Sequence, residues 1–171
     1  MYKIKHGNIL ESKCKSLVIP SNGCAIIGSK SLASFLCDDL LGGKSIEQSS
    51  KAVVVQNGKP FEAGSFFVTH SCGLQKFGFI SIYHAVLSKY PGEFSSLYFI
   101  NKSMKAILES AISVKLSSIA FSSLGTGMER LDYRSVASNM VSLIRQYHVS
   151  IDISVVDVNK SFINEVERLI S

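Results

Sequence analysis

The sequence lacks the patterns that mark metal-binding and secreted proteins. Its four cysteines are Cys14, Cys24, Cys37 and Cys72. None of them forms a C-x-x-C pair, and no histidine lies at ligand spacing from any of them, so we expect no metal site. We interpret the cysteines as buried structural residues with reduced thiols, which predicts a cytosolic or nuclear location.

The chain also has no stretch typical of a targeting segment, an anchor or a charged tail. Its first residues do not form a charged and then apolar signal segment, and no apolar run is long enough to cross a bilayer. There is no internal repeat, linker, low-complexity segment or block of like charge. We therefore expect no membrane association and a single monomeric domain over residues 1–171.

What the sequence does contain is a large apolar fraction and a surplus of positive charge. Apolar residues make up 46% of the 171 residues, enough for a sizeable core. Lys and Arg number 18 against 13 Asp and Glu, a formal net charge of +5. This balance favours anionic partners such as nucleotides, polyanions or nucleic acid, although a merely solvated basic surface fits it equally. No stretch interleaves aromatic and basic residues, so nucleic-acid binding has no motif behind it.

Strand and helix patterns alternate along the chain. Expected strands cover residues 2–5, 17–19, 65–69, 77–86, 118–121 and 151–156, while 53–55 is ambiguous and Pro20 is expected to end the second strand. Expected helices cover residues 31–41 and 94–114 and begin near Asp132 and Asn159, which are good N-caps. Strands joined by crossover helices predict an α/β fold with helices on both faces of a sheet that contains parallel strands.

Two loops of small residues follow expected strands. The run Gly125-Thr126-Gly127 lies between strand 118–121 and the helix at Asp132, and a second loop follows strand 17–19. In such sheets ligands bind outside the carboxyl ends of the strands. Glycines let the backbone approach a ligand closely, and successive N–H groups with a helix N-terminus attract an anion. The sequence therefore predicts a site for a phosphorylated small molecule.

Five stretches carry a further pattern in a fixed order. They are Gly7-Asn8-Ile9, the run from Leu17 to Asn22, the run from Asn57 to Leu74, Ile82-Tyr83-His84-Ala85-Val86, and the run from Ser117 to Tyr133. Together they resemble the macro domain family, the ADP-ribose-binding module, over nearly the whole chain. The resemblance implies a three-layer α/β/α sandwich around a central mixed, largely parallel sheet.

The resemblance also implies a site for ADP-ribose, with no further cofactor. Asn8 falls where the family contacts the adenine, although it also suits a plain turn, and Asn22 would orient the distal ribose. Backbone N–H groups of the two loops would hold the diphosphate. The implied ligand-binding residues are Asn8, Ile9, Asn22, Gly28, Ser29, Ser123, Leu124, Gly125, Thr126, Gly127 and Met128.

Catalytic residues are implied less completely. Hydrolytic members pair the asparagine matched by Asn22 with an aspartate, which aligns here with Ala33. The stretch from Leu124 to Tyr133 is similar to the loop of terminal ADP-ribose glycohydrolases, which places Glu129 at a catalytic carboxylate and Lys89 near a catalytic lysine. Such a lysine would need a lowered pKa. The alternative for Glu129 and its neighbour Arg130 is a solvated ion pair at a helix start.

We therefore expect a binding module for ADP-ribose or ADP-ribosylated proteins, with weak or absent hydrolysis. Two alternatives stay open. One is an ADP-ribosyl-acceptor hydrolase, or an enzyme that processes ADP-ribose-1''-phosphate, using Asn22, or Glu129 with Lys89. The other is a degenerate macro fold that binds nucleic acid or protein through its basic surface.

Overall fold

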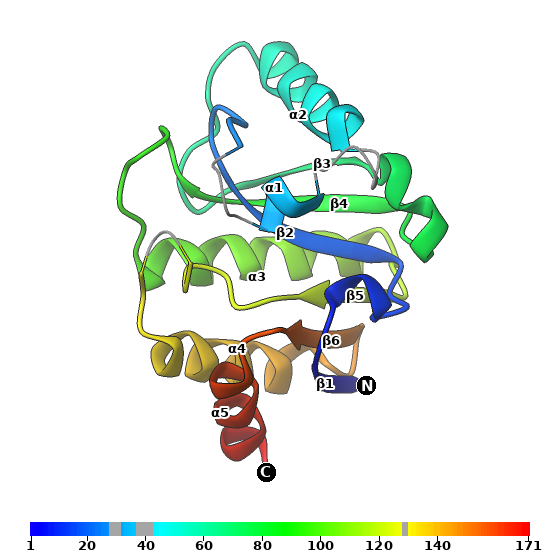
Figure 1. Ribbon diagram of the computed structural model, residues 1–171, viewed down its shortest axis with the longest axis vertical. Helices are drawn as coiled ribbons and strands as arrows, with labels where there is room; N and C mark the ends of the chain where they lie inside the picture. Colours follow the sequence, from blue (N-terminus) through cyan, green and yellow to red (C-terminus); the bar gives the residue numbers. More distant parts are fainter. Residues whose placement is uncertain (28–31, 37–42, 128–129) are drawn as a thin grey trace.

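The computed structural model describes residues 1–27, 32–36, 43–127 and 130–171 and shows one six-stranded sheet (Figure 1). In spatial order the strands run β1-β6-β5-β2-β4-β3. Their bounds are β1 Tyr2–His6, β2 Ser16–Asn22, β3 Phe66–His70, β4 Ser81–Ser88, β5 Ser118–Phe121 and β6 Asp152–Asp157. The helices are η1 Ile9–Glu11, α1 Leu32–Leu36, α2 Gly43–Asn57, η3 Cys72–Phe77, α3 Leu97–Ser113, α4 Tyr133–Tyr147 and α5 Lys160–Ile170.

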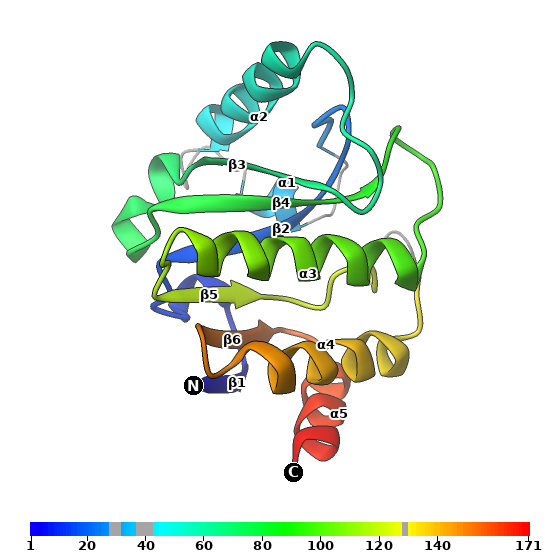
Figure 2. The ribbon, with the colours of Figure 1, turned by 180° about the vertical axis from the view of Figure 1, so that it is seen from behind.

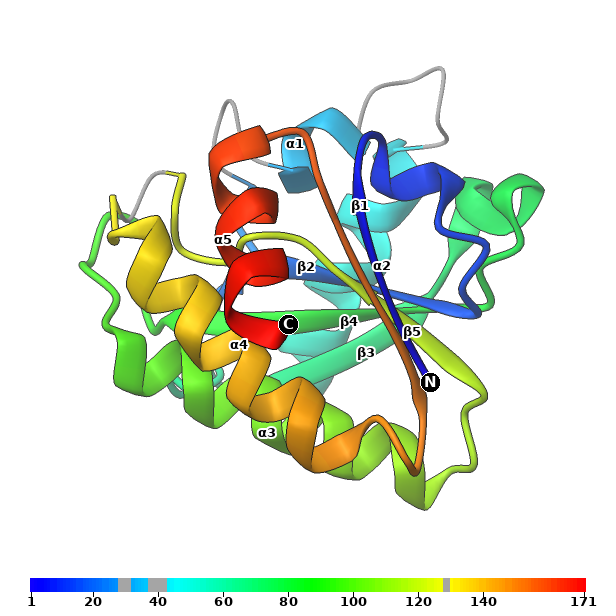
Figure 3. The ribbon, with the colours of Figure 1, turned by 90° about the horizontal axis from the view of Figure 1, so that it is seen from below.

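The sheet is mixed and largely parallel, and it is covered on both faces. Only the β3–β4 pair is antiparallel among the described strands. Helices α3 and α4 lie against one face (Figure 2), while α1 and α2 lie on the other (Figure 3). The core side chains of α5 belong to the same cluster as those of α3 and α4. The expected α/β/α sandwich is confirmed.

The two faces are filled by alternate residues of each strand. On β2, Val18 points into the cluster under α3 and α4, whereas Leu17 and Ile19 point into the cluster under α1 and α2. The apolar stripe of α3, which includes Ile100 and Met104, is fully buried against the first face. This alternation holds the strand ends rigidly, and the loops after them carry the polar side chains.

Two helix starts predicted from N-cap residues are confirmed. Asp132 accepts a hydrogen bond from the backbone N–H of Ser135 at 3.1 Å, and Asn159 accepts one from Phe162 at 3.2 Å. The N–H groups of the first helical turn have no partner within the helix, so a cap oxygen fixes where each helix begins.

Some expected bounds are wrong, and others lie outside the described residues. Residues 53–55, three valines whose pattern was ambiguous in the sequence, belong to helix α2. For such a short apolar run, packing against the rest of the fold decides the secondary structure. The expected strand 77–86 starts only at Ser81, since Phe77 ends the short helix η3. Of the expected helix 31–41, the structure describes α1 and no more.

Pro20 does not end the second strand, and this bears on the site. Strand β2 continues to Asn22 and keeps its register with β4 through Pro20 and Ala85. On its other side, β5 pairs only with Ser16 and Leu17. Beyond Leu17 that edge of β2 has no hydrogen-bonded strand, so the missing N–H of proline is tolerated there. The same divergence of β2 from β5 opens space between their carboxyl ends.

Candidate functional site

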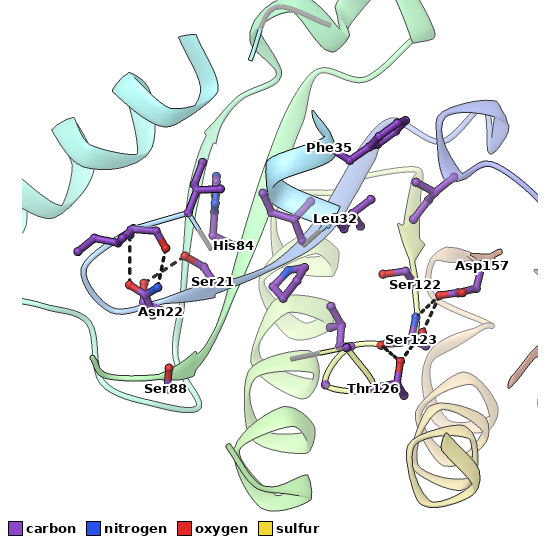
Figure 4. Close-up of a pocket in the computed structure, with 18 of the residues that line it drawn as sticks. Ser21, Asn22, Leu32, Phe35, His84, Ser88, Ser122, Ser123, Thr126 and Asp157 are labelled. Carbon is purple, nitrogen blue, oxygen red and sulfur yellow. Dashed lines mark hydrogen bonds between the residues drawn. The ribbon is translucent and has the colours of Figure 1, made fainter. Parts of the chain in front are cut away.

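A cleft of about 750 Å³ lies across the carboxyl ends of the parallel strands. One end is formed by the turn after β1, including Asn8, and the other by the turn after β4, including Glu93. The loops that follow β2 and β5 form its middle. Figure 4 shows Ser21 and Asn22 on one side of the view and Ser123 and Thr126 on the other. The cleft therefore has an elongated outline that suits a ligand with several chemically distinct parts.

The loop after β5, residues 122–127 and here called the Ser123 loop, is anchored to the next strand. The backbone N–H and the hydroxyl of Ser123 both donate to Oδ2 of Asp157, at 2.8 and 2.7 Å. Thr126 Oγ1 donates to the Ser123 carbonyl at 2.9 Å and lies 2.8 Å from its hydroxyl. Charge-assisted bonds of this kind are stronger than neutral ones, so Asp157 holds the loop in one conformation (Figure 4).

Glycines shape the tip of the Ser123 loop. Gly125 has φ +85°, and a Cβ there would lie 2.2 Å from Cδ1 of Ile100, so any other residue is strained in conformation and in space. A Cβ on Gly127 would meet no described atom within 4 Å, and its backbone borders the open cleft. In the described part of the chain, the N–H groups of Gly125 and Gly127 have no hydrogen-bond partner. Both are available to an anion.

The loop after β2, described over residues 22–27 and here called the Asn22 loop, is organised by its own first residue. Asn22 Oδ1 accepts from the backbone N–H groups of Cys24 and Ile26 at 3.1 and 3.2 Å. Its Nδ2 donates to the carbonyl of Ile26 at 2.7 Å. One Nδ2 hydrogen then remains for a ligand. Asn22 lines the cleft, but most of its hydrogen-bonding groups hold the loop.

Gly23 explains how this loop can pass so close to its neighbours. A Cβ there would lie 2.0 Å from the carbonyl oxygen of Phe61 and 2.8 Å from that of Lys89. The N–H of Gly23 also donates to the carbonyl of Ser88, and its carbonyl accepts from the N–H of Phe61. The Asn22 loop is therefore fastened to the rest of the fold through main-chain contacts that only glycine permits.

At the β1 end, Asn8 and Ile9 line the cleft. The Oδ1 atom of Asn8 accepts from the N–H of Leu10 at 3.0 Å and so caps η1. Its side-chain amide donors have no partner among the described residues. Asn8 is thus a turn residue, and its amide lies at the cleft; contact with an adenine stays a prediction.

His84 reaches the cleft from the floor at the opposite end. Its ring is 2% exposed, stacks on Phe67 with centroids 4.3 Å apart, and its Nε2 lies 2.9 Å from Thr69 Oγ1. Burial lowers the pKa of His84 to about 3, so the ring is neutral at physiological pH. The sequence indicated a core histidine, and the structure adds that it also lines the cleft.

The charged side chains that line the cleft, in the part of the chain that the structure describes, are Asp157 and Glu93. Glu93 Oε2 accepts from the backbone N–H groups of Lys89 and Tyr90 at 3.1 and 2.9 Å, which fixes the turn after β4. Both carboxylates therefore hold loops, and neither was singled out from the sequence. A signal existed for Asp157, because an acid at the end of a buried strand faces the ligand-binding edge of such a sheet.

Lys89 does not meet the requirement of a lysine nucleophile. It does not line the cleft, and its Nζ lies 2.6 Å from Oε1 of Glu62. The hydrogen bond to Glu62 raises the pKa of Lys89, whereas a nucleophilic amine needs a lowered pKa. Arg130, which the sequence suggested as the ion-pair partner of Glu129, is exposed and has a left-handed backbone with φ 53°.

Several predicted residues lie outside the described part of the chain: Gly28, Ser29, Met128 and Glu129. Cleft residues that sequence reasoning missed include Ser21, Ser50 and Ser88 on the polar side, and the exposed Ile26, Phe35 and Phe94 at the rim. Within the described residues no group of three or more His, Cys, Asp or Glu is arranged to hold a metal ion. Among the same residues, no helix has the length and apolar character needed to span a membrane.

Solved structures share this fold. The macrodomain of Mycobacterium tuberculosis DarG is 19% identical, with a TM-score of 0.75, and the match covers 91% of this chain and 97% of that one. The Oceanobacillus iheyensis macrodomain with MES bound is 18% identical, with a TM-score of 0.79, covering 96% and 87%. Thermosipho africanus DarTG in complex with ADP-ribose is 17% identical, with a TM-score of 0.71, covering 88% and 40%.

Sequence comparisons give the family. Comparison with curated proteins finds no match. The family model described as Macro domain matches residues 40–140, which is more than half of the 171 residues. That segment includes β3, β4, β5 and the whole Ser123 loop, and the remaining strands complete the same fold. The chain therefore belongs to the Macro domain family.

Proposed function

We propose that this chain binds ADP-ribose, or an ADP-ribosyl group on a protein, in the cleft between the Asn22 loop and the Ser123 loop. The observation that carries the proposal is the pair of loops at adjacent strand ends, one of which presents two unpartnered N–H groups at Gly125 and Gly127. Family membership and the ADP-ribose complex of Thermosipho africanus DarTG support the choice of ligand.

The proposed orientation follows the order of the strands. Asn8 and Ile9, after β1, meet the adenine, where the unpartnered amide of Asn8 supplies polar contact. The Ser123 loop, after β5, holds the diphosphate through backbone N–H groups, with Gly28, Ser29 and Met128 proposed to contribute. Asn22, after β2, orients the distal ribose with its remaining amide hydrogen.

Binding without efficient hydrolysis is the activity that we propose. The side-chain oxygen and one amide hydrogen of Asn22 are hydrogen-bonded within its own loop. Lys89 forms an ion pair with Glu62, and its pKa is raised. Neither arrangement activates a nucleophile. The role of Glu129, which lies outside the described residues, is left to experiment.

Calorimetric titration tests the proposal directly. ADP-ribose is expected to bind with measurable heat and to raise the melting temperature, since a ligand that binds only the folded state stabilises it. Absence of both effects at millimolar ADP-ribose would refute it. Incubation with a mono-ADP-ribosylated carboxylate protein is expected to release little ADP-ribose. Rapid release that is lost in Asn22→Ala or Glu129→Gln would replace the binding module with a hydrolase.

A further inference from the structure

The imidazole of His84 is a polar group that lines the cleft and has no role in the proposed binding mode. Its Nε2 is occupied by Thr69 Oγ1 at 2.9 Å. Its plane is fixed by a stack of rings, in which Phe67 lies 4.3 Å from His84 and Phe61 lies 5.0 Å from Phe67, centroid to centroid. A side chain held by packing and a second hydrogen bond is a preorganised contact.

His84 lines the cleft, and its other ring nitrogen is Nδ1. This atom has no hydrogen-bond partner among the described residues. Among the described residues, Ser71 Oγ is the only fully buried side-chain polar atom without a hydrogen-bond partner. Because Nδ1 also has no partner, it is not fully buried and keeps some exposed surface, although His84 as a whole is 2% exposed. The space that His84 borders is the cleft, so the exposed surface of Nδ1 is open to a ligand there.

The position of His84 assigns it to one end of the cleft. On β4, His84 pairs in register with Ile19 of β2, which lies two residues before Ser21 on the same face. Ser88, also on β4, pairs with Asn22. Figure 4 shows His84 on the side of Asn22 and away from Asp157. In the proposed orientation, the distal ribose occupies this end.

We propose that His84 determines specificity for the distal ribose by a hydrogen bond between its Nδ1 atom and a ribose hydroxyl. The inference rests on the proposed function. A hydroxyl both donates and accepts, so it fits either neutral tautomer: if Nε2–H donates to Thr69, Nδ1 accepts, and if Thr69 donates to Nε2, Nδ1–H donates. Because the ring is neutral, this contact does not require an acidic group on the ligand.

Two substitutions of His84 separate the contributions of its two ring nitrogens. The amide of asparagine can occupy the Nδ1 position, and the longer glutamine can occupy the Nε2 position. His84→Gln therefore keeps the bond to Thr69 and loses the proposed bond to the ligand, whereas His84→Asn keeps a polar group at the Nδ1 position. The ligands are ADP-ribose and ADP, which lacks the distal ribose.

In calorimetric titrations, His84→Gln is expected to bind ADP-ribose roughly tenfold more weakly than the wild type and to bind ADP unchanged. His84→Asn is expected to stay within about threefold of the wild type for both ligands. Equal affinity of His84→Gln and the wild type for ADP-ribose would overturn this inference alone. Equal losses for both ligands would also overturn it, because His84 would then only support the fold. Failure of the wild type to bind either ligand would overturn the proposed function with it.

A second measurement needs no folded variant. Long-range proton–nitrogen spectra of the wild type report on histidine ring nitrogens, and His6, His70 and His148 serve as internal references. ADP-ribose is expected to shift the Nδ1 signal of His84, and ADP is expected to leave it in place. An unmoved Nδ1 signal at saturating ADP-ribose would contradict the proposal.

Discussion

The two loops that enclose the cleft are held in different ways. The Asn22 loop organises itself: the side chain of its first residue bonds to backbone groups two and four residues later. The Ser123 loop is held from outside, by a carboxylate on β6 that is 34 residues away along the chain. The first loop can therefore form as soon as β2 ends, whereas the second needs β5 and β6 to be paired.

Substitution of one glycine in each loop, Gly23 and Gly125, tests the difference between the two loops with the largest expected effects. Gly23→Ala is expected to lower the free energy of unfolding by about 3 kcal/mol, because its Cβ would overlap backbone atoms that cannot move aside. Gly125→Ala is expected to lower it by roughly 2 kcal/mol, through positive φ and contact with the flexible end of Ile100. Urea denaturation measures both.

Gly127→Ala is the matched control for the glycine pair. No described atom lies within 4 Å of the position that its Cβ would take, so stability should change by less than about 0.5 kcal/mol. Its affinity for ADP-ribose should fall, because the methyl group would occupy the cleft. Equal destabilisation by all three substitutions would mean that neither loop is fixed by its glycine.

Acid should destabilise the protein through His84, which lies at the Asn22 end of the cleft. The pKa of His84 is about 3 in the folded protein and near 6.5 when unfolded, so only the unfolded state takes up a proton as the pH falls below 6.5. Stability is then lost at up to about 1.4 kcal/mol per pH unit, or roughly 2.5 kcal/mol between pH 6.5 and 4.5. His84→Gln should lose less over this range, and parallel curves for the two proteins would contradict the neutral state of His84.

Asp157 and Asn22 can be compared as the residues that hold the two loops. Asp157→Ala removes a carboxylate that accepts two bonds from Ser123 and one from Asn159, and it is expected to cost about 2 kcal/mol. Asn22→Ala removes neutral bonds at a partly exposed site and is expected to cost about 1 kcal/mol. The reverse order in urea denaturation would show that the Asn22 loop is the one that depends on its side chain.

The smallest effect is expected at Lys89, beside the Asn22 loop. Its ion pair with Glu62 is at the surface, so Lys89→Met should shift the melting temperature by no more than about 2 °C. It should also leave ADP-ribose binding unchanged, because Lys89 does not line the cleft. A marked loss of ADP-ribose release from a modified protein in this variant would revive the lysine-dependent hydrolase.

The difference between the loops also explains what could be predicted from sequence. Local patterns were enough for the alternation of strands and helices and for the caps Asp132 and Asn159, because each cap acts on residues close to it in the chain. The three-layer sandwich and the choice of Asn22 came from the resemblance to the macro domain family. Asp157 was missed because its partner Ser123 is brought to it only by the pairing of β5 with β6. His84 was recognised as a core residue, but its place beside the cleft depends on the register of β2 with β4.

Amide chemical-shift mapping with ADP-ribose tests the central claim most directly, that one ligand lies between the two loops. In proton–nitrogen correlation spectra, the amides of Gly125 and Gly127 and those of Asn22 and Ser88 should shift together with a single affinity. The side-chain amide of Asn8 should follow them. Shifts confined to lysine-bearing surfaces away from the cleft, or no shifts at millimolar ADP-ribose, would contradict the account.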